Sequence, residues 1–586
     1  MKELISKQLV RYLERRGVEH VFGLCGHTNI AVLAAMSQSK LNFVNTRHEQ
    51  IAAHIADGYA RAKKKTAVIL SHLGPGLTNA STGVANAALD SIPVVVIAGD
   101  VPSHYYGKHP HQEVNLHSDA AQSEIYRPFV KRVWRVERPD LFPEILQKAF
   151  QLAESGRPGP VLVSVPMDIF SMEIDTALFD RLSHHTTQLQ KPSIDDETAE
   201  KIVRKLVEAR NPVVYAGGGV ILADAADELR QLVDHLSLPV AHSLMGKGVL
   251  PDDHQLTLGM TGFWGTKFVN EKCRTADWIF GVGTRFAEAD CSSWEAEYTF
   301  SMPPSKLIHI DIDPAEIGRN FPVEIGVVSD LKQALIVLNR VARRLFPNGR
   351  TNDALRDQIG AYRRDFQKGN AAHIANEAYP MRPERILSTV REVLPRDAII
   401  TTDVGWNKNG VGQQFPIYTP GSILTPGGFA TMGFGAPAAI GAKLACPDRV
   451  VVALVGDGGF GQNPAVLATA AEQDVAVIWI VMNNNAYGTI AGLEMAHYGT
   501  AFGTVFRRGG EPYHVDFAAI ARAYGVDGVK IGSAADFKPA LEKAIASRKA
   551  CVIDVAMMNE PVPTAGHWNI NDIYSPGRKV SHVAVA

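Results

Sequence analysis

Three observations predict an α/β protein made of three doubly wound parallel-sheet domains. The chain has 586 residues, and at about 150 residues per domain it has room for three or four domains. Its most apolar segments are short and rich in β-branched residues, which is typical of strands buried on both faces. Amphipathic helical stretches separate these segments, and this alternation indicates parallel sheets covered by helices.

The expected elements can be placed in order along the chain. The first twenty residues carry charges throughout and place Leu4, Leu9 and Tyr12 at roughly helical spacing, so they predict an amphipathic helix. Further helices are predicted at 49–64 and 227–238, and strands at 66–71, 92–99, 160–166, 211–219, 450–458 and 475–485. Several of these strands end in Gly, Asp or Asn. Because open parallel sheets bind ligands at the carboxyl ends of their strands, we expect sites there.

Two polar linkers divide the chain. One spans 180–197 and has no periodicity; the other spans 345–373 and is charged. They predict domains at 1–180, 195–345 and 370–558. The tail at 559–586 contains Trp568 and Tyr574, so we expect it to pack on the protein as a lid over the active site.

Composition excludes several classes of function. The 59 basic and 61 acidic residues nearly cancel, so nothing indicates binding to nucleic acid or to an anionic membrane surface. No apolar run approaches the roughly 18 residues that span a bilayer. The five cysteines form no CxxC pair, which argues against a disulfide framework or a zinc site. We therefore expect a soluble, cytoplasmic protein that acts on a small molecule.

The most informative motif is GDGGF at 456–460, at the end of one predicted strand, with MNNNAYG at 482–488 ending the next. Asp457 and Asn484 lie 27 residues apart, so a strand-helix-strand unit would bring them together. Carboxylate and amide oxygens suit Mg²⁺, while Gly458 and Gly459 can offer backbone amides to a phosphate. Each motif alone is as well explained by an ordinary turn. The pair at this spacing predicts a site for Mg²⁺ and a diphosphate.

This pair of motifs resembles that of the thiamine-diphosphate enzymes, and the likeness covers essentially the whole chain. It implies an N-terminal pyrimidine-binding domain, a central Rossmann-like domain and a C-terminal diphosphate-binding domain. It also implies thiamine diphosphate and Mg²⁺ as cofactors. The implied reaction decarboxylates a 2-oxo acid, ligates the resulting carbanion to an aldehyde or ketone, or does both.

The resemblance assigns residues to the metal and the diphosphate. It implies that Asp457, Asn484 and the backbone carbonyl of Ala486 ligate Mg²⁺. The VGWN stretch would lie against the diphosphate through Val404, Gly405, Trp406 and Asn407.

Glu49 lies in an R-H-E context at a predicted strand-to-helix junction. Periodicity alone favours an ordinary first-turn Glu that faces the helix dipole. The resemblance implies instead that Glu49 hydrogen-bonds the aminopyrimidine ring and promotes removal of the thiazolium C2 proton. Pro75 and Asn79 match contacts on the pyrimidine side, although a tight turn before a helix also explains them. Candidates for an apolar wall beside the carboxylate are Ile30, Ile51 and Ala52.

The glycine-rich stretch at 426–441 reads by composition as a closely packed helix start. The resemblance implies that Met432 is a wedge between the two cofactor rings and that the carbonyl of Ala430 accepts a hydrogen bond from the pyrimidine amino group. In this family the domains that carry Glu49 and Asp457 face each other across a subunit boundary. At least a homodimer is therefore implied, and a homotetramer is the usual state.

The middle segments PVVYAGGGV at 212–220 and VGTRF at 282–286 look like those of acetolactate synthases. In that branch they line an FAD site that performs no net redox chemistry, so Gly218 and Arg285 are candidate FAD contacts. The alternative is a Rossmann-like domain that binds no nucleotide.

The residues expected near the substrate depart from acetolactate synthase. His27 stands where those enzymes have a Gly, His72 replaces a small hydroxyl residue, and Leu493 replaces a Trp; Gln112 is retained and His111 is added. Such a pocket suits proton transfer near neutral pH and a polar 2-oxo acid, aldehyde or dione. His27, His72 and Gln112 are candidate catalytic residues, and each histidine alone could be structural. A 1,2-dione hydrolase or aldehyde lyase of the same fold, and a catalytically silent scaffold, remain alternatives.

Overall fold

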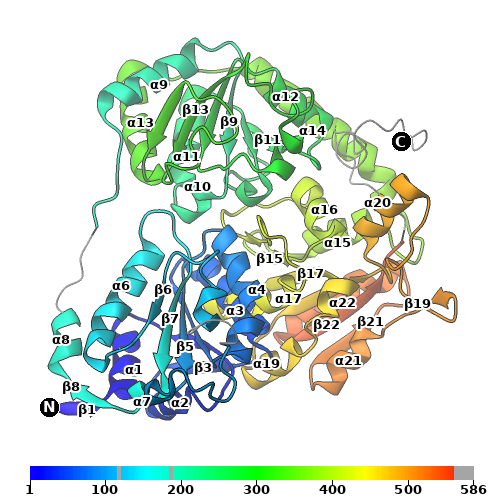
Figure 1. Cartoon of the computed structure of the whole chain (residues 1–586). Helices are drawn as coiled ribbons and strands as arrows, with labels where there is room; N and C mark the ends of the chain where they lie inside the picture. The colour runs from blue at the N-terminus through cyan, green and yellow to red at the C-terminus, as the bar shows by residue number, and fades with distance from the viewer. Residues whose placement is uncertain (115–120, 184–188, 560–586) are drawn as a thin grey trace.

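A computed structural model describes residues 1–114, 121–183 and 189–559 of the chain (Figure 1). In this part the chain forms three domains, each built on a six-stranded sheet whose neighbouring strands are all parallel. The middle domain, green in Figure 1, lies above the blue N-terminal domain and the yellow-to-red C-terminal domain. The predicted α/β fold of three doubly wound sheets is confirmed.

The N-terminal sheet has the order β3-β2-β4-β5-β7-β6. Its strands are β2 (His20–Gly23), β3 (Asn42–Asn45), β4 (Ala67–Ser71), β5 (Val94–Asp100), β6 (Val133–Arg135) and β7 (Val161–Pro166). Its main helices are α1 (Ile5–Arg15), α2 (Ile30–Met36), α3 (Glu49–Lys63), α4 (Pro75–Leu89) and α6 (Phe142–Glu154). Val68 and Leu70 of β4 enter one core with α1 and α6, whereas Ala67 and Ile69 enter another with α3 and α4. Burial on both faces explains why these strands are uniformly apolar.

The middle sheet has the order β11-β10-β9-β12-β13-β14. Its strands are β9 (Pro212–Ala216), β10 (Val240–His242), β11 (Thr257–Met260), β12 (Trp278–Val282), β13 (Lys306–Asp311) and β14 (Ile325–Val328). Its helices are α9 (Asp196–Glu208), α10 (Gly219–Leu222), α11 (Ala226–Leu236), α12 (Lys267–Arg274) and α13 (Leu331–Leu345).

The C-terminal sheet has the order β16-β15-β17-β18-β22-β21. Its strands are β15 (Ile399–Thr402), β16 (Ile423–Leu424), β17 (Val451–Gly456), β18 (Ile478–Asn483), β21 (Asp527–Lys530) and β22 (Cys551–Ala556). Its helices are α15 (Pro383–Val393), α16 (Trp406–Gln414), α17 (Gly435–Ala445), α18 (Asp457–Phe460), α19 (Val466–Glu472), α20 (Gly488–Tyr498), α21 (Phe517–Ala523) and α22 (Ala534–Ser547).

Two details go beyond the sequence prediction, and one prediction falls largely outside the described residues. A short strand β1 (Lys2–Leu4) precedes α1 and pairs antiparallel with β8 (Glu173–Asp175), closing the N-terminal domain. The second predicted linker contains α14 (Asp353–Ile374), which packs on the middle domain by stacking Tyr362 on Phe268 with ring centroids 4.2 Å apart. The tail predicted to form a lid falls almost entirely outside the described residues.

The N-terminal and C-terminal domains meet through α3 and α17. A Cβ added to Gly58 would lie 2.3 Å from the carbonyl oxygen of Ala438, and one added to Gly441 would lie 2.0 Å from that of Ile55. The two helix backbones therefore touch, which only glycine permits at these positions. In the part of the chain that the structure describes, no helix combines the length and apolarity needed to cross a bilayer.

Candidate active site

Each of the three sheets places several predicted site residues at the point where its strand order reverses. In the N-terminal sheet this point lies between β2, which leads to His27, and β4, which leads to His72. In the C-terminal sheet it lies between β15, which leads to Val404, and β17, which leads to Asp457. The crevice at such a switch point is the usual ligand site of doubly wound sheets.

The predicted metal ligands lie together at the carboxyl ends of β17 and β18. Asp457 and Asn484 are only 4% and 8% exposed. Burial raises the pKa of Asp457 to about 6, although the backbone amides of Gly458, Asn484 and Asn485 act in the opposite direction. A buried carboxylate with this shift is poorly compensated by its protein neighbours, and a bound cation would supply the missing compensation.

The geometry of these groups fits an octahedral Mg²⁺. One end of the Asn484 amide lies 3.0 Å from Asp457 Oδ1 and 3.0 Å from the carbonyl oxygen of Ala486, while its other end is 3.4 Å from Asn559 Oδ1. When the amide nitrogen donates to Asn559, the Asn484 oxygen faces the oxygens of both Asp457 and Ala486. Neighbouring ligands of Mg²⁺ with bonds of about 2.1 Å are separated by about 3 Å, so the three oxygens suit this ion.

The GDGG turn forms a tight floor beside the metal ligands. A Cβ added to Gly458 would lie 2.6 Å from the Tyr487 ring and 3.4 Å from Met432 Cε, so Met432 reaches the turn. Gly459 lies against the carboxylate of Asp403. Ala430 has a φ of +51°, a left-handed conformation that is rare outside glycine.

The VGWN stretch lies beside this floor, at the start of α16. Asn407 donates its amide to the carbonyl oxygens of Asp403 and Leu454, at 3.0 and 2.8 Å. Its amide nitrogen therefore fixes the loop, and its oxygen faces Gly405. Val404, Gly405 and Trp406 are half-buried at the same strand end.

Glu49 is the first residue of α3 and is 5% exposed. Asn79 donates its side-chain amide to Glu49 Oε2 at 2.9 Å, and a Cβ added to Gly76 would lie 3.3 Å from Glu49 Oε1. Pro75 and Asn79 themselves are exposed, so this side of the site is open in a single chain. Ile51 and Ala52 are buried as expected, whereas the proposed wall residue Ile30 is 59% exposed.

The predicted histidines converge from three separate loops. The ring centroids of His27 and His72 are 4.7 Å apart, and those of His27 and His111 are 6.4 Å apart. Thr28 Oγ1 lies 2.8 Å from His72 Nδ1, and Gln112 Oε1 lies 2.9 Å from His72 Nε2. Both nitrogens of His72 are therefore occupied. The His27 side chain is exposed but partly desolvated. This desolvation is the main cause that lowers its pKa, and repulsion from His72 and His111 adds to it.

Leu493, by contrast, belongs to another region. It is half-buried on α20 of the C-terminal domain, on a helix whose Ile490 and Met495 are exposed.

The middle domain has its own cavity, of about 1180 Å³, at its boundary with the N-terminal domain. It lies at the switch point between β9 and β12. Gly219 and Gly283 approach closely there, because a Cβ added to Gly219 would lie 2.7 Å from the Cα of Gly283. Gly218 and Arg285, the candidate FAD contacts, both line it. Glycine-rich strand ends at a switch point are the usual setting of a dinucleotide.

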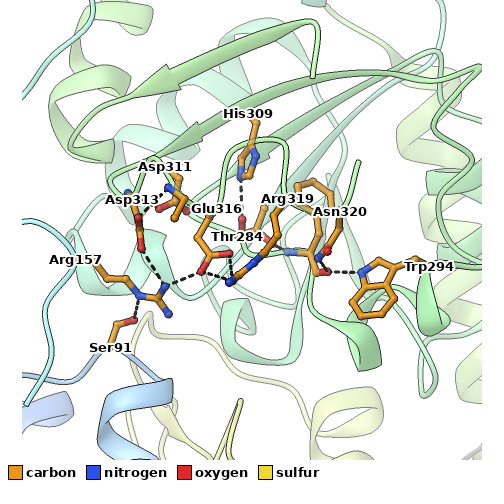
Figure 2. Close-up of polar contacts among 12 residues, drawn as sticks. Ser91, Arg157, Thr284, Trp294, His309, Asp311, Asp313, Glu316, Arg319 and Asn320 are labelled. Carbon is orange, nitrogen blue, oxygen red and sulfur yellow. Dashed lines mark hydrogen bonds and ion pairs between the residues drawn. The ribbon is translucent and has the colours of Figure 1, made fainter. Parts of the chain in front are cut away.

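An ion-pair cluster closes one wall of this cavity (Figure 2). Arg157 of the N-terminal domain donates to Ser91, Asp313 and Glu316 at 2.8, 3.2 and 2.6 Å. Burial raises the pKa of the neighbouring Asp311, another lining residue, to about 6.

Sequence reasoning missed three groups that shape the site. They are Thr28 beside His72, Tyr487 against the GDGG turn, and Asp403, which accepts N–H groups from Gly433 and Gly435. Asp403 could have been found from the sequence, because it directly follows the short β-branched run AIITT at 398–402, where a strand end is expected. The other two are defined by contacts across loops that no local pattern reveals.

In the part of the chain that the structure describes, no three or more His, Cys, Asp or Glu side chains are arranged to hold a metal. The candidate ligand set is instead one carboxylate with an amide and a carbonyl oxygen. Such an all-oxygen set suits Mg²⁺ better than a transition metal.

Comparison with known proteins identifies the family. The models for the N-terminal TPP binding domain, the central domain and the C-terminal TPP binding domain of thiamine pyrophosphate enzymes match residues 5–121, 199–338 and 403–555.

Curated relatives match over nearly the full length. The chain is 35% identical over 560 residues to a probable acetolactate synthase large subunit of Methanocaldococcus jannaschii, covering 94% of this chain and 91% of that protein. It is 33% identical to the acetolactate synthase isozyme 3 large subunit of Escherichia coli, covering 92% of each chain. It is 32% identical to an acetolactate synthase of Arthrospira platensis, covering 96% of each.

These relatives favour a decarboxylating carboligase over the dione hydrolase, the aldehyde lyase and the silent scaffold. The chain belongs to the thiamine pyrophosphate enzymes, in their acetolactate synthase-like branch, and is an enzyme that uses thiamine diphosphate for decarboxylation and ligation.

Proposed function

We propose that this enzyme decarboxylates a short, polar 2-oxo acid and joins the remaining fragment to a polar aldehyde or ketone. The observation that carries the proposal is the convergence of His27, His72 and His111 at the N-terminal switch point. Imidazoles stabilise hydroxyl and oxyanion groups that an apolar pocket would leave unpaired. The acetolactate made by the named relatives is therefore not the product we expect here.

The C-terminal domain would hold the cofactor. Asp457, Asn484 and the carbonyl of Ala486 would ligate Mg²⁺, and the amides of the GDGG turn would face the diphosphate. When bound, thiamine diphosphate supplies a carbon nucleophile that adds to the donor carbonyl and accepts the electron pair released with carbon dioxide. Met432, which reaches the GDGG turn, would shape the cofactor by packing against its rings.

The N-terminal domain would control proton transfer. Glu49 would hold a proton at the pyrimidine ring nitrogen, and its low exposure keeps competing water away from that hydrogen bond. The Asn79 amide at 2.9 Å orients the carboxylate.

The three histidines would have different roles toward the substrate. His72 is fixed by Thr28 and Gln112, so it orients its neighbours. His27 carries the exposed imidazole, and it would exchange a proton with an oxygen of the donor or acceptor near neutral pH. His111, stacked at 6.4 Å, would contact the substrate.

We also propose that the active unit is at least a homodimer, and a homotetramer in its full state. Glu49 is buried, yet Pro75, Asn79 and His27 around its loops are exposed in one chain. A second subunit would cover this face with its C-terminal domain and place Leu493 near the substrate. The molar mass of the protein in solution, with and without cofactor, tests this arrangement.

For the middle-domain cavity we propose FAD, because its volume, its glycine-rich strand ends and Arg285 suit a dinucleotide. Purified protein should be yellow, or become yellow on reconstitution with FAD. A colourless protein that cannot be reconstituted would favour a domain without flavin.

The substrate proposal is tested by a screen of 2-oxo acids, aldehydes and 1,2-diones. Mass spectrometry would measure carbon dioxide release and ligated product separately, with wild type and His27→Ala in parallel. We expect ligation with hydroxylated or otherwise polar partners, and loss of that preference in His27→Ala. Preference for pyruvate with 2-oxobutyrate, or dione cleavage without carbon dioxide, would contradict the proposal.

A further inference from the structure

The N-terminal domain forms hydrogen bonds with the loop that leads from β16 to α17. Asp90, which follows α4, is 6% exposed and accepts the backbone N–H groups of Gly427 and Gly428 at 2.8 and 2.7 Å. This contact joins residues 337 and 338 positions apart in the chain. A buried side-chain carboxylate therefore fixes two successive peptide groups of another domain.

Asp90 itself is held in place by a buried ion-pair network. Arg61 of α3 donates to Asp90 Oδ2 at 2.8 Å and to Asp57 Oδ1 at 2.5 Å. The same guanidinium donates to the carbonyl oxygen of Thr425, at 3.2 Å. One cation thus faces two carboxylates, so Asp90 depends on the two glycine N–H groups to complete its hydrogen bonding.

The far end of the same loop has a second anchor. Gly433 and Gly435 donate their N–H groups to the two oxygens of Asp403, at 3.0 and 2.9 Å, and Asp403 is fully buried. Only residues 429–432 lie between the two anchored ends. They contain both residues of this loop assigned to the cofactor, Ala430 and Met432.

The start of the loop is closely packed at Gly427. A Cβ added to Gly427 would lie 2.5 Å from Asp90 Oδ1 and 2.5 Å from Met245 Sδ of the middle domain. Ala430 is held at a φ of +51°, which a non-glycine residue keeps only when its surroundings determine it. Two fixed ends and a strained centre indicate a preorganised loop.

We propose that Asp90 is a positioning residue for the reaction: from the N-terminal domain, it fixes the 427–432 loop and so sets where Met432 and the carbonyl of Ala430 meet the cofactor. This inference rests on the proposed roles of those two residues. It also means that one chain's N-terminal domain organises the cofactor floor of its own C-terminal domain.

The test measures C2 proton exchange of thiamine diphosphate at saturating cofactor in the full-length holoenzyme. We expect Asp90→Asn to slow exchange at least tenfold and to change the near-ultraviolet circular dichroism of the bound cofactor. A purely structural role would lower the unfolding temperature and leave both readouts of the remaining folded holoenzyme unchanged.

A second variant guards against loss of folding. Asp90→Glu keeps the charge opposite Arg61 but lengthens the side chain by one methylene, so the loop must shift; we expect slowed exchange in a variant that still folds and binds the cofactor. Asp57→Asn is the matched control, because Asp57 shares Arg61 but accepts no N–H group from the loop. It should exchange within about twofold of wild type.

Wild-type exchange in Asp90→Glu, or an equal loss in Asp57→Asn, would overturn the inference. Failure of the proposed function looks different. In that case wild type would prefer pyruvate with 2-oxobutyrate, or cleave a dione without releasing carbon dioxide, while C2 exchange in the Asp90 variants would still be slowed relative to wild type.

Discussion

The two halves of the site are built in different ways. The metal and diphosphate end consists of Asp457 and Asn484 on adjacent strand ends of one β17-helix-β18 unit, both nearly inaccessible to solvent. The histidine end gathers His27, His72 and His111 from three separate loops, and two of these side chains are exposed. The candidate metal ligands thus belong to one local strand-helix-strand unit, whereas the proposed substrate contacts depend on loops, where functional variation concentrates.

The largest expected effect lies at the rigid end. Asp457→Ala removes the charged member of the candidate ligand set, so binding of thiamine diphosphate with Mg²⁺ should be abolished. Isothermal titration calorimetry measures this affinity, and Asp448→Ala provides an exposed carboxylate of the same domain as a control. Unchanged affinity in Asp457→Ala would remove the metal assignment.

The next largest effect should separate binding from proton transfer. Glu49→Gln keeps the size of the side chain, so cofactor affinity should stay within about tenfold, or roughly 1.4 kcal/mol. C2 proton exchange should slow by about 10² to 10⁴, the usual contribution of general acid-base catalysis. Asn79→Ala removes the 2.9 Å hydrogen bond to Glu49 but leaves the carboxylate in place, so it should slow C2 exchange much less than Glu49→Gln does. If Glu49→Gln exchanged at the wild-type rate, this residue would have no part in the mechanism.

A smaller effect should appear at the loop end. His27→Ala should lower kcat/KM for polar substrates by about 10- to 100-fold, the cost of one or two unmade hydrogen bonds. Cofactor affinity should not change, in contrast to Asp457→Ala. His373→Ala, on α14 of the middle region, is the control. Wild-type kinetics of His27→Ala on every polar substrate would show that the histidine end does not select the substrate.

The smallest effect concerns pH. Burial and repulsion from His72 and His111 lower the pKa of His27 below its ordinary value of 6.5, so its neutral form persists to lower pH than in a free histidine. If neutral His27 accepts a proton, kcat/KM falls as pH drops through this lowered pKa. His111→Asn removes one repulsion, so the acidic limb should move up by less than about one pH unit and should stay below 6.5. A downward shift would be inconsistent with repulsion.

Much of the fold followed from local pattern. The strands predicted at 66–71, 450–458 and 475–485 are β4, β17 and β18, because apolar β-branched runs of this length have few other ways to be buried. The helix predicted at 49–64 is α3, with Glu49 as its first residue. By contrast, α14 went unrecognised because charged residues are spread along it and Ile359 is its one fully buried side chain, so it has no continuous apolar face.

By itself, the sequence determined the three-sheet architecture and the pairing of Asp457 with Asn484, since these depend on periodicity and on spacing within one strand-helix-strand unit. The cofactor class followed from the resemblance of its motifs to those of the thiamine-diphosphate enzymes. Only the tertiary structure decided which partners the side chains have. In the folded chain both nitrogens of His72 have partners, Arg157 pairs with Glu316 of another domain, and Asp90 accepts a hydrogen bond from a loop more than 330 residues away. Such contacts form where separately folded sheets pack together, and hydrogen bonds between distant loops leave no periodic trace in a sequence.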